Sequence, residues 1–460
     1  MKDTFFNYKG KNIRSIGLFG IGKSNIAVYN YLRKKFPDLS VTVRSSNEAD
    51  FSAIKATRAF FGEDCFFDIR EDILFISPSA RRDNEKLIDA ERRGVILSSD
   101  TEFFFSLSEK DVYAITGSDG KSTTTYITSR LLSDSYDSVI QSANIGEPMT
   151  SHLDDAGNIS FVAELSSFQL MYQKPKSKRC LITNITENHL NWHKSFDEYI
   201  SAKSNILDNS KERILNYDSE ISRTLLAGYD CFGVYSSKET EALLKSKVDA
   251  EIYLTLDNGY IILNGKRLLN TNYIKLKGSH NIKNFMAAIA LSHGKAERDC
   301  IIETAQSFGG LEHRCEFVTS IDGVDYYDSS IDSSPQRCIN TLNMMQKQVV
   351  LILGGRSKGL DFSILAKAIS EKARCVITNG ECAEEIEEAL SKSEIFQHSS
   401  VKLIRATSFF EAIELAKCEA MPGDAVLLSP AATSYDSFKN FEERGCAFKE
   451  YVKKIKAKGF

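Results

Sequence analysis

The fold is decided by the stretch from Val112 to Thr125, which reads VYAITGSDGKSTTT. An apolar run typical of a β-strand breaks at Gly117 and Gly120, and a helix-compatible run at 123–132 follows. Glycines let the backbone turn tightly, so that successive N–H groups can point inward at one anion. The following helix adds its free N–H groups and the positive end of its dipole. The stretch therefore predicts a phosphate-binding loop.

The loop is shorter than the general form of this motif, because two residues instead of four separate its glycines. A GKS tripeptide also occurs by chance in strand–helix turns, but the strand before it and the helix after it favour phosphate binding. Lys121 would reach the terminal phosphates of a nucleotide, and the hydroxyl of Ser122 or Thr123 would bind Mg²⁺. The expected phosphate-binding residues are Gly117, Ser118, Asp119, Gly120, Lys121, Ser122 and Thr123.

Length and composition indicate a globular protein of about three domains. The chain has 460 residues, of which 42% are hydrophobic and 26% charged. A net charge of −4 gives no reason to expect nucleic acid or an anionic membrane as partner. The N-terminus lacks the apolar core of a signal peptide, and no apolar run is long enough to span a bilayer. Ten scattered cysteines without CxxC pairs predict reduced, mostly buried thiols in a cytoplasmic protein.

The N-terminal part begins with a βαβ pattern. The expected elements are strands at 13–22, 39–43, 73–76 and 95–97 and helices at 23–34 and 83–93. The turn after the first strand reads G-x-G-x-x-N, with Gly20, Gly22 and Asn25. A dinucleotide fingerprint requires a third glycine, and an acid after the second strand, where this chain has Asn25 and Arg44. The residues therefore argue against NAD, and the turn holds another nucleotide diphosphate or only makes a tight bend.

Polar residues follow two strands expected after the phosphate loop. The strand at 159–164 ends in Glu164, and ligands of open α/β sheets collect at strand carboxyl ends, so Glu164 is a candidate metal ligand. A helix-capping or surface glutamate is the alternative. The strand at 180–184 leads to His189, a second ligand candidate, although a lone histidine is more often structural. Lys203 lies on a predicted helix and, taken alone, would be a solvated lysine.

The remainder continues the α/β pattern. Two Asn-Gly pairs, at 258–259 and 264–265, predict β-hairpins. Asn281 and Asn284 precede a helix expected at 285–293 and either contact a base or ribose or cap that helix. A third α/β unit begins near Glu312, and its expected elements are strands at 349–353 and 425–428 and a final helix at 438–456. The strand at 349–353 runs into a glycine-rich, basic loop, GGRSKG. Three units with anion-binding loops suggest three ligands.

At this point the residues resemble a known family. The ordered blocks GSDGKST, ELSSFQL, NITENHLNWH, YISAKSNIL, GSHNIKN, GLEHRCEFV, GGRSKG and SPAATSYDSFKNFEERG resemble the Mur ligases, more loosely in the first domain. ELSSFQL and the C-terminal block are most similar to the branch that adds D-glutamate. The resemblance implies an α/β fold of three domains. They are a Rossmann-like domain at 1–108 that binds the UDP substrate, a P-loop ATPase-like domain at 109–311, and a Rossmann-like domain at 312–460 that binds the amino acid.

The resemblance also implies a reaction, the ATP-dependent formation of an amide bond in peptidoglycan precursor synthesis. The carboxylate of UDP-N-acetylmuramoyl-L-alanine would attack the γ-phosphate of ATP, giving an acyl phosphate that the amine of D-glutamate then opens. Two anions must meet, so Lys121 and Mg²⁺ would neutralise the charge on the transferred phosphoryl group. The family further implies a cytoplasmic monomer that acts without nucleic acid or membrane.

Residue roles carry over by position. The implied catalytic residues are Lys121, Glu164, His189 and Lys203. ATP would be held by the phosphate loop together with Asn281, Asn284, Arg314 and Asp328. Two Mg²⁺ ions are expected, one on Ser122 and Glu164 and one on His189 and a carbamylated Lys203. The UDP substrate would contact Gly20, Ile21, Gly22, Lys23, Ser24, Arg44, Ser45, Ser46 and Asn144. D-glutamate would contact Lys358, Ser434, Tyr435 and Phe441.

Four positions depart from the family pattern. Asn188 and Asn191 replace aspartates beside the histidine, so the metal site carries less negative charge than usual. Arg44 replaces an acid near uracil, and Ser330 replaces a lysine of some members.

Two alternatives remain: a Mur-type or folylpolyglutamate-type ligase for another amino acid, and a noncatalytic Mur-like subunit that binds a cell-wall precursor. ELSSFQL and the C-terminal block argue against the first, and the lack of paired cysteines in the middle domain against the second.

Overall fold

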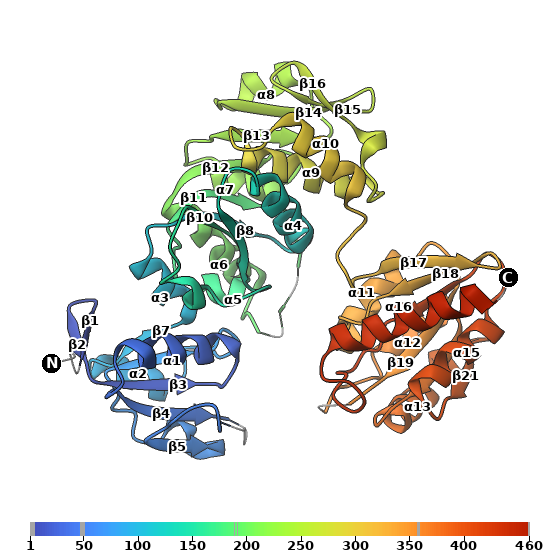
Figure 1. Cartoon of the computed structure of the whole chain (residues 1–460), viewed down its shortest axis with the longest axis horizontal. Helices are drawn as coiled ribbons and strands as arrows, with labels where there is room; N and C mark the ends of the chain where they lie inside the picture. The colour runs from blue at the N-terminus through green and yellow to red at the C-terminus, as the bar shows by residue number, and fades with distance from the viewer. Residues whose placement is uncertain (1–4, 47–50, 188, 191, 357–358, 459–460) are drawn as a thin grey trace. The chain divides into compact units, whose positions relative to one another are not determined.

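The computed structural model describes residues 5–46, 51–187, 189–190, 192–356 and 359–458. The chain divides into two compact units, Met1–Phe308 (unit 1) and Gly309–Phe460 (unit 2). Figure 1 shows unit 1 in blue to gold and unit 2 in orange to red. The boundary expected between residues 311 and 312 lies near this division, whereas the expected boundary inside unit 1, at 108–109, stays a prediction.

The first sheet of unit 1 is a five-stranded parallel sheet in the order β5-β4-β3-β6-β7. Its strands are β3 (Ser15–Phe19), β4 (Ser40–Ser45), β5 (Arg58–Phe61), β6 (Ile73–Ile76) and β7 (Ile96–Ser98). They alternate with α1 (Lys23–Lys35), the 3-10 helix η1 (Gly62–Phe66) and α2 (Glu85–Arg92), and α3 (Asp100–Leu107) follows. A separate hairpin, β1 (Phe6–Tyr8) and β2 (Lys11–Ile13), precedes them. The first strand lies in the centre and the order reverses beside it, which is the Rossmann arrangement.

The turn after β3 lies where the strand order reverses, the usual place for a ligand in such sheets. Gly20 has a φ of 85°, and a Cβ there would lie 2.5 Å from the Ser77 hydroxyl oxygen, so the position requires glycine. The Asn25 side chain donates hydrogen bonds to the carbonyl oxygens of Phe19, Gly20 and Phe75. Asn25 therefore ties the turn to β6, which explains an amide where a dinucleotide fingerprint has glycine.

The central sheet of unit 1 has nine strands in the order β16-β15-β14-β13-β12-β11-β8-β10-β9. They are β8 (Asp111–Thr116), β9 (Ser138–Ala143), β10 (Ile159–Glu164), β11 (Ser177–Ile182), β12 (Ser210–Asn216), β13 (Gly233–Ser236), β14 (Ile252–Asp257), β15 (Tyr260–Leu263) and β16 (Lys266–Asn270). In this order, the strands from β14 to β9 run parallel to one another. The expected hairpin turns also form: Asn258-Gly259 joins β14 to the antiparallel β15, and Asn264-Gly265 joins β15 to the antiparallel β16. The strand of the phosphate loop, β8, thus lies inside the sheet, between β10 and β11.

The helices of unit 1 cover this central sheet. They are α4 (Lys121–Leu132), α5 (Ser167–Leu170), α6 (Phe196–Asp208), α7 (Glu220–Leu226), α8 (Glu241–Lys247), α9 (Ser279–Ser292) and α10 (Arg298–Ser307), with 3-10 helices η2 (Met149–His152) and η3 (Thr271–Tyr273). Helix α9 begins six residues before the predicted 285, so Asn281 and Asn284 lie within its first two turns. Helix α4 packs on α9, which brings the phosphate loop beside those asparagines.

Unit 2 holds a six-stranded sheet in the order β17-β18-β22-β19-β20-β21, parallel except for the β17–β18 hairpin. Its strands are β17 (Glu316–Ile321), β18 (Val324–Asp328), β19 (Val349–Gly354), β20 (Ala373–Asn379), β21 (Lys402–Arg405) and β22 (Ala425–Leu428). Its helices are α11 (Pro335–Met344), α12 (Leu365–Lys372), α13 (Ala383–Ser391), α14 (Glu394–Gln397), α15 (Phe409–Glu419) and α16 (Phe441–Lys458). Helix α16 begins later than the predicted 438, because the Asn440 side chain accepts the N–H of Glu443 and caps it.

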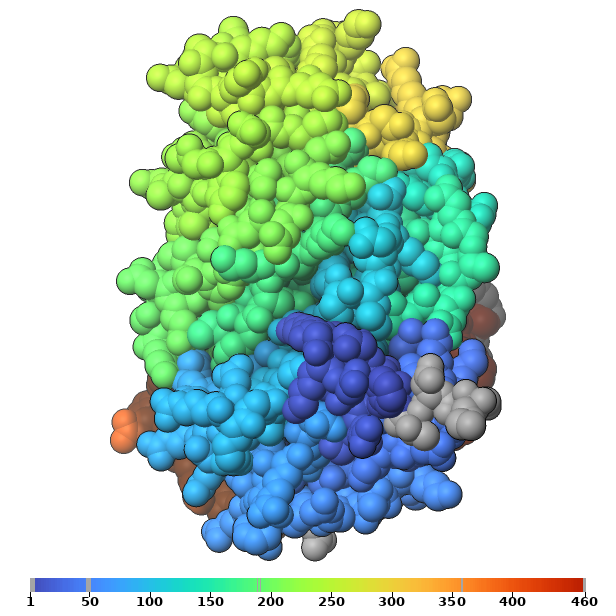
Figure 2. Space-filling view, turned by 90° about the vertical axis from the view of Figure 1, so that its left-hand side faces the viewer, coloured from blue at the N-terminus to red at the C-terminus, as the bar shows by residue number. Residues whose placement is uncertain are grey.

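Polar contacts between the two sheets of unit 1 include a hydrogen bond and a cation–π contact at Trp192, and the blue and green parts of this unit adjoin in Figure 2. The Trp192 indole donates to the carbonyl of Ser79, and the Arg81 guanidinium lies 4.8 Å from the indole centroid. Elsewhere, Asp100 on α3 accepts hydrogen bonds from the backbone and hydroxyl of Thr150.

Within the described ranges, no helix is long and apolar enough to cross a membrane. All ten cysteines are free thiols, as predicted.

We expect Asp100 to make the stability of unit 1 depend on pH. Burial raises the pKa of the Asp100 carboxyl to about 7, far above its value in an unfolded chain. The folded state then binds the proton more tightly, so the free energy of unfolding falls as pH rises from about 4 to 7. Asp100→Asn should remove this fall and raise the free energy of unfolding at pH 8 by a few kcal/mol, at about 1.4 kcal/mol per pKa unit.

Urea unfolding at pH 5.5 and pH 8 measures the effect. The matched control is Asp249→Asn, which changes an exposed aspartate of the same unit and should leave both values unchanged. Equal pH dependence in the wild type and Asp100→Asn would contradict the assignment.

Candidate functional site

The phosphate loop connects β8 to α4, as the sequence predicted. Gly117 has a φ of 144°, and a Cβ there would lie 1.9 Å from the Thr183 hydroxyl oxygen. Gly120 has a φ of 79°, and a Cβ there would lie 2.4 Å from Oδ1 of Asn284. Both positions therefore exclude any side chain, because the loop is pressed between β11 and α9. Lys121 is the first residue of α4, so the free N–H groups of that helix begin at the loop.

Residues that were not predicted from the sequence form hydrogen bonds with the phosphate loop. The backbone N–H of Ser118 donates to the carbonyl of Asn184 at 2.8 Å, and that of Asp119 donates to Oδ1 of Asn184 at 2.9 Å. The hydroxyl of Thr183 donates to the carbonyl of Asp119 at 2.6 Å. The Ser118 hydroxyl also lies 2.8 Å from that of Tyr199. The only sequence signal for Asn184 was its place at a strand end.

Lys121 lies over the loop that it follows. Its Nζ donates to the carbonyl oxygens of Gly117 and Ser118, each at 2.8 Å. The ammonium is therefore held at the loop, where a nucleotide's terminal phosphates would lie if the loop binds them. Ser122, the expected magnesium ligand, is buried beside it, whereas Thr123 is half-buried.

Glu164 lies at the carboxyl end of β10, next to the loop strand, and is 2% exposed. Its Oε1 accepts the side-chain N–H of Asn144 at 2.7 Å, while its buried Oε2 has no hydrogen-bond partner among the described residues. A buried carboxylate oxygen without a partner is costly unless a cation or proton occupies it. The arrangement therefore fits a hard cation with oxygen ligands, such as Mg²⁺. Asn144, expected to position the muramoyl substrate, is thereby tied to the same carboxylate.

Lys203 is buried, which contradicts its reading as a solvated helix lysine. Its side chain is 2% exposed on α6, and Nζ donates to the carbonyl of Gly117 at 2.8 Å. The same nitrogen lies 3.4 Å from the Thr116 hydroxyl and 4.7 Å from the centroid of the Tyr199 ring. Burial and, next, the charge of Lys121 lower the pKa of Lys203 well below its ordinary value. An amine that loses its proton readily thus lies at the loop.

His189 follows β11 and lies near these groups. Its φ is 57°, and its ring centroid lies 5.0 Å from that of Phe168 and 6.4 Å from that of Tyr199. The residue is exposed, so its ring is accessible to a ligand. Asn188 and Asn191, where the family has aspartates, lie outside the described residues.

The two asparagines of α9 meet the phosphate loop from the other side. Oδ1 of Asn284 lies 3.4 Å from the Thr124 hydroxyl on α4, and Nδ2 of Asn284 donates to Oδ1 of Asn281 at 3.1 Å. Nδ2 of Asn281 in turn donates to the carbonyl of Lys277. The prediction that they contact ATP stays a prediction, but the structure does bring them to the loop.

The residues expected to bind the UDP group lie at the carboxyl ends of β3 and β4. After β3 come Gly20, Ile21, Gly22, Lys23 and Ser24, while Ser45 ends β4 and Ser46 follows it. The neighbouring Arg44 is 1% exposed, and its guanidinium donates to Glu71 at 2.8 and 3.1 Å and to three backbone carbonyls. The Arg44 guanidinium thus already has protein partners, which argues against a direct contact with uracil. Its role in the structure is to hold the loop that precedes β6.

In unit 2, Asp328 ends β18 and is fully buried. Its Oδ2 lies 2.7 Å from Nδ1 of His313, and its Oδ1 accepts the backbone N–H of Ser330 at 2.9 Å. Both oxygens already have protein partners, and the prediction that Asp328 and the exposed Arg314 contact ATP stays a prediction. His313, Glu316 and Asp328 also have the composition of a metal site. However, the short His313–Asp328 contact is better explained by a proton between the two groups.

Three of the expected D-glutamate residues are described. Ser434 is buried in the loop after β22, Tyr435 is 53% exposed, and Phe441 begins α16. Lys358 lies outside the described residues. Sequence reasoning missed Arg444, which is 2% exposed and donates to the carbonyls of Ser330, Gly354 and Ala432. Burial lowers the pKa of Arg444 to about 10. One guanidinium therefore joins the loops after β18, β19 and β22.

Comparisons with known proteins show the family of this chain. The family model described as the Mur ligase middle domain matches residues 115–292, and the Mur ligase glutamate ligase domain matches residues 313–432. A UDP-N-acetylmuramoylalanine–D-glutamate ligase of Ruminiclostridium cellulolyticum is 37% identical, with 97% of each chain covered. The chain belongs to the Mur ligase family. A ligase of the same name from Clostridium novyi is 35% identical, with 99% of this chain and all of that one covered.

A solved Mur ligase shows the same fold at lower identity. The UDP-N-acetylmuramate–alanine ligase of Thermotoga maritima is 20% identical, with 96% of this chain and 100% of that chain covered and a TM-score of 0.54. This likeness supports the α/β architecture of a multi-domain Mur ligase.

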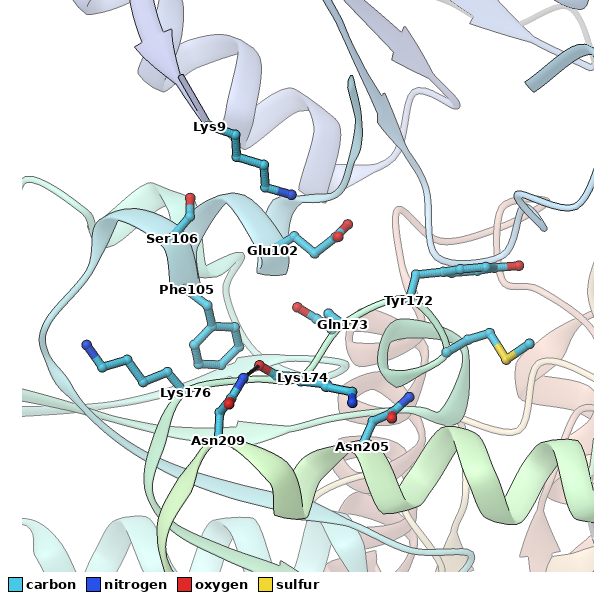
Figure 3. A pocket seen from close by; sticks show the side chains of 11 residues that line it. Lys9, Glu102, Phe105, Ser106, Tyr172, Gln173, Lys174, Lys176, Asn205 and Asn209 are labelled. Carbon is cyan, nitrogen blue, oxygen red and sulfur yellow. Dashed lines mark hydrogen bonds between the residues drawn. The ribbon is translucent and has the colours of Figure 1, made fainter. Parts of the chain in front are cut away.

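Unit 1 of this Mur ligase also has a cavity of about 590 Å³ between α3, α6 and the segment that follows α5 (Figure 3). Its described lining includes Lys9, Glu102, Tyr172, Lys174 and Asn209, and none of these was predicted as a site residue. Lys174 pairs with Asp208, and the Asn209 side chain donates to the carbonyl of Lys174. None of the described lining residues belongs to the phosphate loop, so the cavity is separate from that loop.

Proposed function

We propose that this Mur ligase adds D-glutamate to UDP-N-acetylmuramoyl-L-alanine, at the expense of ATP, in the synthesis of peptidoglycan precursors. The observation that carries the proposal is the near-full-length similarity to ligases of that name, at 37% identity with 97% of each chain covered. The loop geometry supports it, because the predicted phosphate-binding loop and a buried carboxylate lie at the ends of neighbouring strands, and the buried amine of Lys203 on α6 donates to that loop.

The first half of the proposed reaction takes place at the phosphate loop. The carboxylate of the substrate's alanine attacks the γ-phosphorus of ATP, forming an acyl phosphate and releasing ADP. Lys121, with the N–H groups at the start of α4, compensates the negative charge that spreads over the transferred phosphoryl oxygens. The amine of D-glutamate then attacks the acyl carbon, and phosphate leaves as the amide bond forms.

Ser122 and Glu164 would hold one Mg²⁺, and His189 with a carbamylated Lys203 would hold a second. When bound, Mg²⁺ neutralises phosphate charge and orients the attacking carboxylate. The buried Oε2 of Glu164, which has no hydrogen-bond partner in the described part of the chain, supports the first site. The lowered pKa of Lys203 supports the second, because only a neutral amine combines with CO₂. The resulting carbamate would supply an anionic oxygen ligand where Asn188 and Asn191 supply none.

Substrate binding divides between the two units. The turn at 20–24 and the serines at 45–46 would hold the UDP group, with Asn144 near the muramoyl part. Ser434, Tyr435, Phe441 and Lys358 of unit 2 would hold D-glutamate, where cationic and hydroxyl groups pair with its two carboxylates. We expect the enzyme to act on these charged, water-soluble substrates in the cytoplasm, as a monomer.

The amino-acid specificity tests the proposal. Phosphate release should require UDP-N-acetylmuramoyl-L-alanine and D-glutamate together, and L-glutamate, L-alanine, L-lysine and meso-diaminopimelate should fail. Two fixed carboxylates leave only one enantiomer with its amine facing the acyl phosphate. Phosphate release is measured with each amino acid in turn at equal concentration. Equal turnover with L-glutamate, or turnover with another amino acid only, would overturn the assignment.

A further inference from the structure

One cluster of side chains in unit 2 joins a thiol, an imidazole and a carboxylate, and the proposed reaction uses no thiol. Cys446 lies on α16, which packs on β17 and β18 (Figure 1). Its Sγ lies 3.9 Å from Nε2 of His313, and Nδ1 of the same ring lies 2.7 Å from Oδ2 of Asp328. We propose that Cys446 is an activated thiol, a site of covalent modification by soft electrophiles of the α,β-unsaturated carbonyl class.

The carboxylate of Asp328 determines which nitrogen of the His313 ring donates a hydrogen bond and which accepts one. Asp328 is fully buried, and its Oδ1 already accepts the backbone N–H of Ser330. A carboxylate only accepts, so the proton of the neutral imidazole lies on Nδ1 and points at Oδ2. Nε2 then presents its lone pair toward the thiol of Cys446. This is the relation of nucleophile, base and orienting group found in catalytic triads, assembled from residues up to 133 positions apart.

The imidazole is held firmly in this orientation. The backbone N–H of His313 donates to Oε2 of Glu316 at 2.9 Å, and the ring meets that of Phe441 edge-on at 6.2 Å between centroids. Gly445 lets α16 approach, since a Cβ there would lie 2.1 Å from Nδ1 of His313. His313 is buried while Cys446 is exposed, so the base is shielded and the thiol is accessible.

The chemistry follows from this arrangement. As Sγ attacks the β-carbon of the unsaturated carbonyl compound, the thiol proton passes to Nε2 of His313. The new S–C bond forms while the C=C electron pair moves toward the carbonyl oxygen. The imidazolium, stabilised by Asp328, then returns the proton to the α-carbon. The thiol has added across the double bond, with no leaving group and no oxidant.

The chain contains its own matched control. Of its ten free cysteines, Cys418 and Cys446 are the exposed ones, and Cys418 lies on α15 of the same unit. The contacts of the described residues give Cys418 no histidine partner. A difference in reactivity between the two thiols therefore measures activation by His313 and not accessibility alone.

The test uses the full-length folded protein and N-ethylmaleimide at limiting concentration, with the modified peptides quantified by mass spectrometry over time. Cys446 should react at least about tenfold faster than Cys418 in the folded protein, as expected for general-base assistance, and at the same rate in 8 M urea. His313→Gln, checked for folding by circular dichroism, should reduce the rate of Cys446 to that of Cys418. Where that variant fails to fold, Asp328→Asn replaces it, because an amide no longer fixes the imidazole proton.

Equal rates at Cys446 and Cys418 in the folded wild type would overturn the proposal. So would a fast Cys446 whose rate is unchanged in the folded His313→Gln or Asp328→Asn variant. The readout is labelling and not turnover, so the result is independent of the proposed ligase activity.

Discussion

Replacing Lys121 by alanine should lower phosphate release by on the order of 10³-fold or more. Its Nζ lies over the loop at 2.8 Å from the carbonyls of Gly117 and Ser118, where it would compensate charge on the transferred phosphoryl group. Binding of UDP-N-acetylmuramoyl-L-alanine should remain nearly intact, because we place the UDP contacts on the turns that follow β3 and β4. Turnover and substrate binding by calorimetry measure the two effects separately.

A matched control is Lys211→Ala, which removes an exposed lysine from β12 of the same sheet and should leave turnover unchanged. A Lys121→Ala enzyme within tenfold of the wild type would remove the phosphate loop from the mechanism.

Replacing Lys203 by alanine should also nearly abolish turnover, because it removes an anionic carbamate, whereas Lys121→Ala removes a cation. As an ammonium, Lys203 would sit buried beside Lys121 and any bound Mg²⁺, where like charges repel strongly. Its lowered pKa instead favours the neutral amine, and reaction of that amine with CO₂ gives a carbamate. Acetate or another short carboxylate should then partly restore turnover in Lys203→Ala, since it replaces the missing anion.

The same additive provides the control, because acetate should not rescue Lys121→Ala, which lacks a cation. A second readout is independent of turnover: ¹³CO₂-equilibrated wild-type enzyme should give a carbamate carbon signal that Lys203→Ala lacks. Full activity of Lys203→Ala, or an unmodified amine beside bound metal in an ordered structure, would contradict the carbamate.

The sequence predicted helices and strands well where the residues of a segment alone determine its structure. The strands β6, β10 and β22 have the predicted bounds, and both Asn-Gly hairpins form. The phosphate loop joins its strand and helix as expected, because two glycines and a GKS tripeptide act within a few residues. The start of α9 was missed, since the polar residues from Ser279 have no apolar helical period and are held there by contacts with α4.

Side-chain environments were less predictable, because they depend on distant segments. Nothing near Lys203 in the sequence shows its burial, which comes from the packing of α6 on the end of β8. Arg44 was expected at a ligand, but Glu71, 27 positions away, takes its guanidinium into the interior. The roles of Lys203 and Glu164 that the family resemblance implies stay predictions, whereas the hydrogen bonds from Arg444 to three loops could be found only in the structure.

The most direct test of the central claim follows the oxygen atoms of the substrate carboxylate. UDP-N-acetylmuramoyl-L-alanine carrying ¹⁸O in both carboxylate oxygens is incubated with ATP, D-glutamate and enzyme, and the released phosphate is analysed by mass spectrometry. Attack of the carboxylate on ATP makes one of these oxygens the bridge of an acyl phosphate, and that oxygen leaves with phosphate when the amide forms. The account predicts one ¹⁸O atom in each phosphate released. Phosphate without ¹⁸O, accompanied by amide formation, would contradict it.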